Sequence, residues 1–193
     1  MCTLIVSSGP SNGDEGSSGQ GSGGEGSEGE GSEGEGAEGE GGAGGCFVAG
    51  TPVATPSGLA PIETIRVGDV VCARDLASNL NTERPVVRVF SEIGHAISEI
   101  RLKDETLQCT PGHRFFAGGW LEAAGLNPSH SIAAIDGSHT TVISSTTTPR
   151  AEVVHNFAVA DDHTFFVGRT GVLVHNDKMA EAGDEDGEGD VEY

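Results

Sequence analysis

Basic residues are scarce in this sequence. It has 10 Lys and Arg against 30 Asp and Glu, which gives a formal net charge of −20 at pH 7. Such an excess of negative charge repels phosphate backbones and anionic lipid surfaces. The balance therefore argues against a nucleic acid or an anionic membrane as a partner.

Long apolar runs are also missing. No stretch of the sequence approaches the roughly 20 apolar residues that a membrane-spanning helix needs. The opening residues 2–6 are too short for the apolar region of a signal peptide, and no basic region precedes them. The sequence predicts no transmembrane span and favours neither a cytoplasmic nor a surface-associated location.

Cysteines are few, and their positions follow no regular spacing: Cys2, Cys46, Cys72 and Cys109. Disulfide frameworks and zinc sites usually show paired spacings such as Cys-x-x-Cys. We therefore expect no disulfide framework, no metal and no cofactor, and we interpret Cys2 as an incidental thiol. A zinc site built from Cys46, Cys109, His113 and His163 is the alternative, which metal analysis would reveal.

Composition divides the chain into three parts. Residues 1–45 are mostly Gly, Ser and Glu, with a loose repeat around residues 26–36, and residues 178–193 are again Gly-rich and acidic. Such segments have little apolar surface to offset the entropy of ordering them. We expect a disordered linker over 1–45, a folded domain over 46–177 and a disordered acidic tail over 178–193.

The middle part has short apolar runs of period two, rich in Val, Ile, Thr and Phe. This pattern predicts strands over residues 67–73, 85–90, 100–102, 106–109, 140–144, 153–159, 163–167 and 172–174. Asp104-Glu105 and Thr170-Gly171 separate neighbouring runs and predict hairpin turns. Helical signals are limited to single turns at residues 61–65 and 120–124. The fold class predicted is a single all-β domain.

Cys46 follows the pair Gly44-Gly45 at the start of this domain. Its thiol can reach the carbonyl carbon of Gly45 through a five-membered ring, which would convert the peptide bond into a thioester. Glycine permits backbone geometry at this point that bulkier residues forbid. The ordinary alternative is a buried structural cysteine on the first strand.

Thr110 and His113 are candidate partners for that thiol. They are three residues apart, and Pro111-Gly112 between them forces a turn that lets both side chains face one point. A histidine can protonate a departing amide nitrogen, and a threonine can hold the oxyanion or the histidine. A loop-capping histidine is the alternative use of His113.

The far end of the domain carries a second candidate group. The side-chain amide of Asn176 can attack its own backbone carbonyl, forming a succinimide and releasing Asp177. His175 could polarise that carbonyl or protonate the leaving amine, with His163 as a second proton carrier and Asn156 as a hydrogen-bonding partner. For His163 and Asn156, satisfied polar groups at strand ends are the alternative. The remaining candidates in polar loops are assigned no role: His95, His130 and His139.

Together these residues resemble the Hint superfamily, which includes inteins, Hedgehog autoprocessing domains, bacterial intein-like domains and the Hint domains of polymorphic toxins. The resemblance is carried by four blocks in order: residues 46–71, 110–113, 153–159 and 162–176. It implies a horseshoe-like, pseudo-twofold all-β fold that brings both ends together. It also implies catalytic roles for these residues: Cys46, Thr110, His113, His163, His175 and Asn176. Asn156, the remaining catalytic candidate, stands where many relatives place Asp.

The position after the terminal Asn also departs from the intein pattern. Inteins need Cys, Ser or Thr after the terminal Asn, whereas Asp177 stands there. The resemblance is therefore closest to bacterial intein-like and toxin-type Hint domains, which cleave rather than splice. We expect single-turnover self-cleavage beside Gly45 and Asp177, with the chain's own flanks as substrate, in a monomer. An inactive β-rich spacer and Hedgehog-like acyl transfer to an external nucleophile are the alternatives.

Overall fold

The computed structural model describes Cys2 and residues 45–176. The predicted tail over 178–193, and the predicted linker apart from Cys2 and Gly45, lie outside the described residues. The described part contains β1 (Phe47–Val48), β2 (Pro52–Thr55), β3 (Gly58–Pro61), η1 (Ile62–Thr64), β4 (Val70–Asp75), β5 (Leu80–Leu102), β6 (Thr106–Cys109), β7 (Arg114–Phe116), β8 (Trp120–Glu122), η2 (Ala123–Gly125), β9 (Ser131–Ala133), β10 (His139–Val159), β11 (Thr164–Val167) and β12 (Val172–His175).

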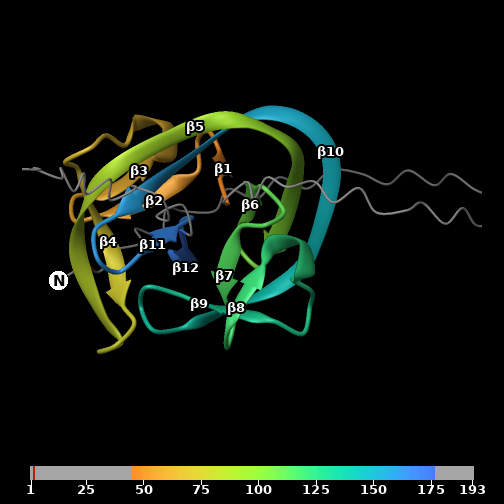
Figure 1. The fold of residues 1–193 in the computed structure, drawn as a ribbon. Coiled ribbons are helices and arrows are strands. Elements are labelled where there is room, and N and C mark those ends of the chain that lie inside the picture. The colour runs from red at the N-terminus through yellow and green to blue at the C-terminus, as the bar shows by residue number, and fades with distance from the viewer. Residues whose placement is uncertain (1, 3–44, 177–193) are drawn as a thin grey trace, which may run out of the picture. The chain divides into compact units, whose positions relative to one another are not determined.

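The strands form two sheets of six. One has the order β4-β5-β6-β1-β10-β9, and the other has the order β3-β2-β11-β12-β7-β8. The long strands β5 and β10 pair antiparallel with each other and arch over the shorter strands in Figure 1. The predicted all-β, horseshoe-like fold is confirmed.

Strand lengths differ from the sequence-based prediction. The runs predicted over 85–90 and 100–102 are parts of one 23-residue strand, β5, and those over 140–144 and 153–159 are parts of the 21-residue β10. Backbone pairing continues through polar segments because β5 and β10 serve as each other's partner, with register shifts at three points. His95 and His139 consequently lie in strands, not in loops. Residues 120–122 also form a strand, so the second helical turn is confined to η2.

Both predicted hairpin turns are confirmed, and one side chain joins them. The turn at Asp104-Glu105 connects β5 to β6, and the turn at Thr170-Gly171 connects β11 to β12. The buried Glu105 carboxylate accepts hydrogen bonds from the backbone N–H groups of Arg169 and Thr170, both at 2.8 Å. These N–H groups compensate the buried charge. Because they belong to the second turn and Glu105 to the first, the Glu105 side chain links the two turns.

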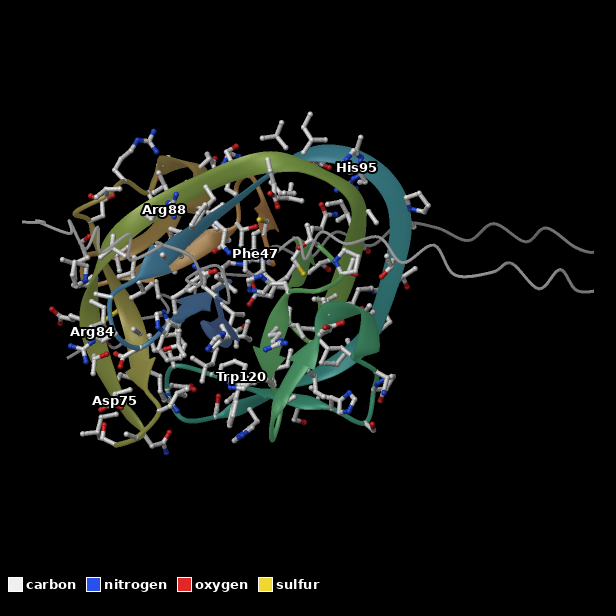
Figure 2. All side chains as sticks on the ribbon, viewed as in Figure 1. Phe47, Asp75, Arg84, Arg88, His95 and Trp120 are labelled. Carbon is white, nitrogen blue, oxygen red and sulfur yellow. A yellow bond between two sulfur atoms is a disulfide. The ribbon has the colours of Figure 1, made fainter. Side chains whose placement is uncertain are left out.

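Phenylalanines dominate the core. Phe47, Phe115, Phe157 and Phe165 are at most 1% exposed, and the Phe157 and Phe165 ring centroids are 4.4 Å apart. Burying each such ring stabilises the fold by about 1.5–3 kcal/mol. Figure 2 shows Phe47 inside the arch and His95 on its outer edge. Phe47, the residue directly after Cys46, is therefore part of the core.

Cys2 forms a disulfide with Cys72 on β4, 70 residues away along the chain. The interpretation of Cys2 as an incidental thiol is therefore wrong. Both cysteines are buried, and the Asn81 side chain donates hydrogen bonds to the carbonyl oxygens of Cys2, at 3.4 Å, and Ile135, at 2.7 Å. A cross-link between such distant positions leaves no spacing pattern in the sequence, which is why the prediction missed it.

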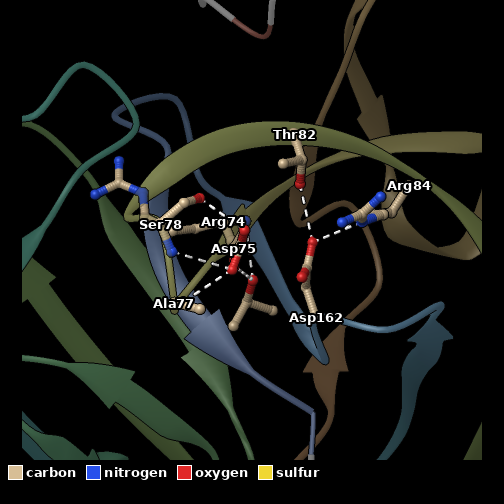
Figure 3. A network of polar contacts seen from close by, with 8 residues as sticks. Arg74, Asp75, Ala77, Ser78, Thr82, Arg84 and Asp162 are labelled. Atoms are coloured by element: carbon tan, nitrogen blue, oxygen red, sulfur yellow. Dashed lines mark hydrogen bonds and ion pairs between the residues drawn. The ribbon is translucent and has the colours of Figure 1, made fainter.

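A polar network fixes the turn before β11 (Figure 3). The Asp162 carboxylate accepts hydrogen bonds from Thr82, at 2.9 Å, and Arg84, at 2.7 Å, both on β5. Thr164 in turn donates to the carbonyl oxygen of Arg74 on β4, at 2.7 Å. These contacts fix both sides of His163.

Within the described residues, no helix is long and apolar enough to cross a membrane.

Candidate functional site

The two ends of the described domain meet because β1 lies between β6 and β10. Phe47 is paired with Cys109 on one side and with His155 on the other. Cys46 therefore lies beside Thr110, which follows β6, and near Asn156 on β10. The structure brings Cys46, Thr110, His113, Asn156 and Asn176 together, and each is at most 5% exposed.

Thr110 holds the backbone on both sides of Cys46. The Cys46 N–H donates to the Thr110 hydroxyl at 2.9 Å, and the Thr110 N–H donates to the Cys46 carbonyl at 2.8 Å. The nitrogen that would leave Gly45 in a cleavage reaction is therefore fixed by a hydroxyl group. The Thr110 hydroxyl thus contacts the nitrogen of this bond, whereas the sequence-based prediction was that it holds the oxyanion or His113.

His113 lies against the Gly45 backbone and packs on Phe47, with ring centroids 4.2 Å apart. Burial lowers the pKa of His113 to about 3, although the Gly45 backbone opposes the shift. The imidazole is therefore neutral at pH 7. Burial also raises the pKa of the nearby Cys109 well above its ordinary value, and Cys46 adds to this effect. Cys109 thus stays a thiol.

Asn156 connects the two ends of the domain. Its side-chain N–H₂ donates to the carbonyl oxygen of Gly45 and, at 3.0 Å, to the side-chain oxygen of Asn176. The Phe157 N–H donates to the Asn156 side-chain oxygen at 2.8 Å, which fixes the orientation of the amide. One amide group is therefore in contact with the Gly45 carbonyl and with the Asn176 side chain.

Asn176 is held by backbone groups as well. Its side-chain N–H₂ donates to the Phe157 carbonyl, and its own N–H donates to the His163 carbonyl at 2.8 Å. His163 has a φ of 50°, a left-handed conformation that costs a non-glycine residue about 1 kcal/mol. This backbone turn brings the His163 carbonyl to Asn176.

The two C-terminal histidines are neighbours but are not stacked. The His163 and His175 ring centroids are 6.4 Å apart, and Trp120 lies 4.9 Å from His175. Both histidines are partly buried, and Nδ1 of each ring is shielded from solvent. Among the described residues, no group of three or more His, Cys, Asp or Glu side chains could hold a metal ion, so the zinc alternative gains no support.

Comparison with known proteins identifies the family. The family model described as the pretoxin HINT domain matches residues 52–177. The chain belongs to this Hint family. The solution structure of a bacterial intein-like domain from Clostridium thermocellum is similar to it, with 30% identity, a TM-score of 0.65, and 68% of this chain and 98% of that chain covered.

More distant solved structures share the Hint fold. A DnaB intein from Synechocystis sp. PCC 6803 has 19% identity and a TM-score of 0.60, covering 68% of this chain and 98% of that chain. The gp41-1 intein has 22% identity and a TM-score of 0.58, covering 69% and 100%. The search of curated proteins found no match to this chain. The chain therefore carries a Hint domain of the autoprocessing type.

The Hint domain site includes residues that sequence reasoning missed. Glu92 on β5 accepts a hydrogen bond from the Cys46 thiol at 3.3 Å. Trp120 packs against His175. Neither belongs to a recognisable motif, and Glu92 is 46 residues away from Cys46 in sequence. Only the pairing of β5 with β10 brings Glu92 to the thiol.

The fit around Gly45 predicts a large effect of one methyl group. A Cβ atom at Gly45 would lie 2.1 Å from Nδ1 and 2.4 Å from Cα of His113. Because Cα belongs to the backbone, it yields little, and overpacking of this kind costs about 1–3 kcal/mol. We expect Gly45→Ala to lower the free energy of unfolding by that amount in urea denaturation.

Gly119→Ala is the matched control, since a Cβ at Gly119 meets nothing within 4 Å. It should unfold at the urea concentration of the parent chain. Equal midpoints for Gly45→Ala and the parent chain would contradict the close packing of Gly45 against His113.

Proposed function

We propose that this Hint domain cleaves its own chain at two bonds, Gly45–Cys46 and Asn176–Asp177. The observation that carries the proposal is the contact of Asn156 with both the Gly45 carbonyl and the Asn176 side chain. A purely structural β domain has no need to gather a thiol, a neutral imidazole and two amides around one buried peptide bond.

The N-terminal cut begins with an N–S acyl shift. The Cys46 sulfur attacks the Gly45 carbonyl carbon, the C–N bond breaks, and the amide becomes a thioester with a free Cys46 amine. The Asn156 amide donates a hydrogen bond to the carbonyl oxygen as negative charge develops there. Thr110 holds the leaving nitrogen, and His113, which lies beside Gly45, relays a proton to it.

The C-terminal cut uses the Asn176 side chain. Its amide nitrogen attacks the Asn176 carbonyl carbon, closing a succinimide ring and releasing the amine of Asp177. The contacts with Asn156 and with the Phe157 carbonyl orient the amide for this attack. His175 and His163 are the proton carriers for the leaving amine.

Asp177 decides the outcome between cleavage and splicing. A carboxylate is a poor acyl acceptor compared with a thiol or hydroxyl group. The acyl group of the thioester is therefore transferred to water or to an external nucleophile, and the Cys46 thiol is released. The two cuts then proceed independently, with the chain's own flanks as substrate and a monomer as the reacting unit. The similarity to a protein named as a bacterial intein-like domain supports this choice.

Intact mass measurement tests the proposal. The purified chain is incubated with and without dithiothreitol for a day, and every sample is fully reduced and denatured before measurement. We expect dithiothreitol to increase the release of residues 1–45, because a thiol intercepts the thioester. We also expect a fragment that begins at Asp177 with or without dithiothreitol.

The other outcomes are equally informative. A single unchanged mass would overturn the proposal and favour an inactive β-rich module. A ligated product that lacks residues 46–176 would show splicing in spite of Asp177. An N-terminal fragment that carries the mass of an added alcohol or amine would favour Hedgehog-like acyl transfer.

A further inference from the structure

Glu92 carries a carboxylate into the buried site, and no motif assigns it a role. It lies on β5, where it is paired with Val154 of β10. Two residues further on, Gly94 faces the same way, and a Cβ there would lie 3.4 Å from Thr110. Val154 packs in one cluster with Cys46. This face of β5 therefore lies next to the Gly45–Cys46 peptide bond.

The Cys46 thiol donates a hydrogen bond to Oε1 of Glu92 at 3.3 Å, a distance within the range for sulfur donors. Cys46 is fully buried, whereas Glu92 is partly exposed. A buried sulfur is poorly solvated as an anion, so it needs a partner that removes its proton during the attack. A carboxylate that also reaches solvent fits that role.

We propose that Glu92 is the general base that removes the proton from the Cys46 thiol in the acyl shift. This inference rests on the self-cleavage proposed above. In the step, the S–H bond breaks and the proton passes to the Glu92 carboxylate while the sulfur bonds to the Gly45 carbon. When the C–N bond breaks, one proton reaches the Cys46 nitrogen through His113, and Glu92 returns to its carboxylate form.

Proton transfer also removes an electrostatic conflict. A thiolate beside a carboxylate would place two negative charges within one contact distance, which is unfavourable in a buried site. Once Glu92 has taken the proton, it is neutral, and the negative charge moves from sulfur to the carbonyl oxygen next to Asn156. The geometry therefore favours a transfer concerted with attack over a stored thiolate.

His113 is a poor candidate for the same task. Its lowered pKa makes it a weak base, and it lies on the Gly45 side of the bond. Other titratable groups near this region are Cys109, which stays protonated, and His175, which lies close enough to His113 to lower its pKa; Glu152 of β10 is paired with Arg150 at 2.6 Å. Of these groups, Glu92 is the one whose hydrogen bond to the Cys46 sulfur is established.

Glu92→Gln tests the proposal in the full chain. Glutamine keeps the size and an acceptor oxygen but has no proton affinity comparable to that of a carboxylate. General-base catalysis contributes about 100- to 10,000-fold, so we expect the dithiothreitol-dependent N-terminal cut to slow by at least about 100-fold. The C-terminal cut in the same molecules should keep its rate, which shows that the domain is folded. Glu99→Gln is the matched control, because Glu99 is an exposed β5 residue that accepts a hydrogen bond from Gln108.

The pH profile separates a base from a structural hydrogen bond. At saturating dithiothreitol, we expect the parent rate to rise much less than tenfold per pH unit over about pH 6 to 8, because a carboxylate base removes the proton without hydroxide. The Glu92→Gln rate should rise about tenfold per pH unit, since hydroxide must then remove the proton. Glu152→Gln should follow the parent profile.

Each outcome bears on one claim. Cleavage of the parent chain with an unchanged N-terminal rate in Glu92→Gln overturns the role of Glu92 and leaves the proposed function intact. Failure of both cuts in the parent chain overturns the proposed function itself. If Glu92→Gln fails to fold, the parent pH profile alone decides, because a tenfold rise per pH unit in the parent chain contradicts a carboxylate base.

Discussion

Cys46→Ala is expected to abolish the cut after Gly45 and to leave the cut after Asn176 at its parent rate. Asn176→Ala should do the reverse. The reason is that each bond is attacked by its own nucleophile, and neither reaction supplies an atom to the other. Intact mass measurement over a day, with dithiothreitol present, distinguishes the two patterns as loss of one fragment or the other.

Asn156→Ala belongs to the same series, because one amide contacts both reacting groups. It should slow both cuts, by about 100-fold where its hydrogen bond stabilises the oxyanion. His95→Ala, an exposed change on the outer arch, should leave both rates unchanged. Parent-like cleavage in both Cys46→Ala and Asn176→Ala would rule out this mechanism.

The sequence predicted the fold class and named most of the candidate residues that the structure brings together, because both depend on local patterns. Period-two runs indicated strands, and the turns at Asp104-Glu105 and Thr170-Gly171 were visible as polar breaks between them. Cys46, Thr110, His113 and Asn176 could be named as candidates because the chemistry proposed for each involves groups near it in sequence. Their mutual contacts required the topology that places β1 between β6 and β10.

The features that were missed depend on distant pairing. In the sequence, nothing distinguishes Glu92 from an ordinary polar residue of a strand. Only the register of β5 with β10 brings it to Cys46. The length of β5 was underestimated because a strand paired along its whole length tolerates polar stretches. The Cys2–Cys72 disulfide was missed because its two cysteines are 70 residues apart, so that only the fold brings them together.

The disulfide predicts that cleavage alone does not separate the fragments. Cys2 lies before the proposed cut at Gly45–Cys46, and Cys72 lies after it, so the bond spans the cleavage site. Hydrolysis or capture of the thioester then nicks the backbone while the cross-link holds residues 1–45 on the domain. Both sulfurs are shielded, with Cys2 3% and Cys72 1% exposed. Release should therefore need two events, cleavage and reduction.

Neutral hydroxylamine separates these events, because it captures a thioester without reducing a disulfide. After this treatment, residues 1–45 and 46–176 of the parent chain should run as one species under non-reducing denaturing conditions and as two fragments once reductant is added. Cys2→Ser and Cys72→Ser should each separate residues 1–45 from residues 46–176 without reductant, while Cys46→Ala should keep residues 1–176 as one species under both conditions. Separation of the parent fragments without reductant would show that the cross-link does not hold the N-terminal segment. If the fragments do stay joined, the N-terminal segment leaves the domain only where disulfides are reduced, so the redox state of the surroundings controls the release step and leaves the chemistry at Cys46 unchanged.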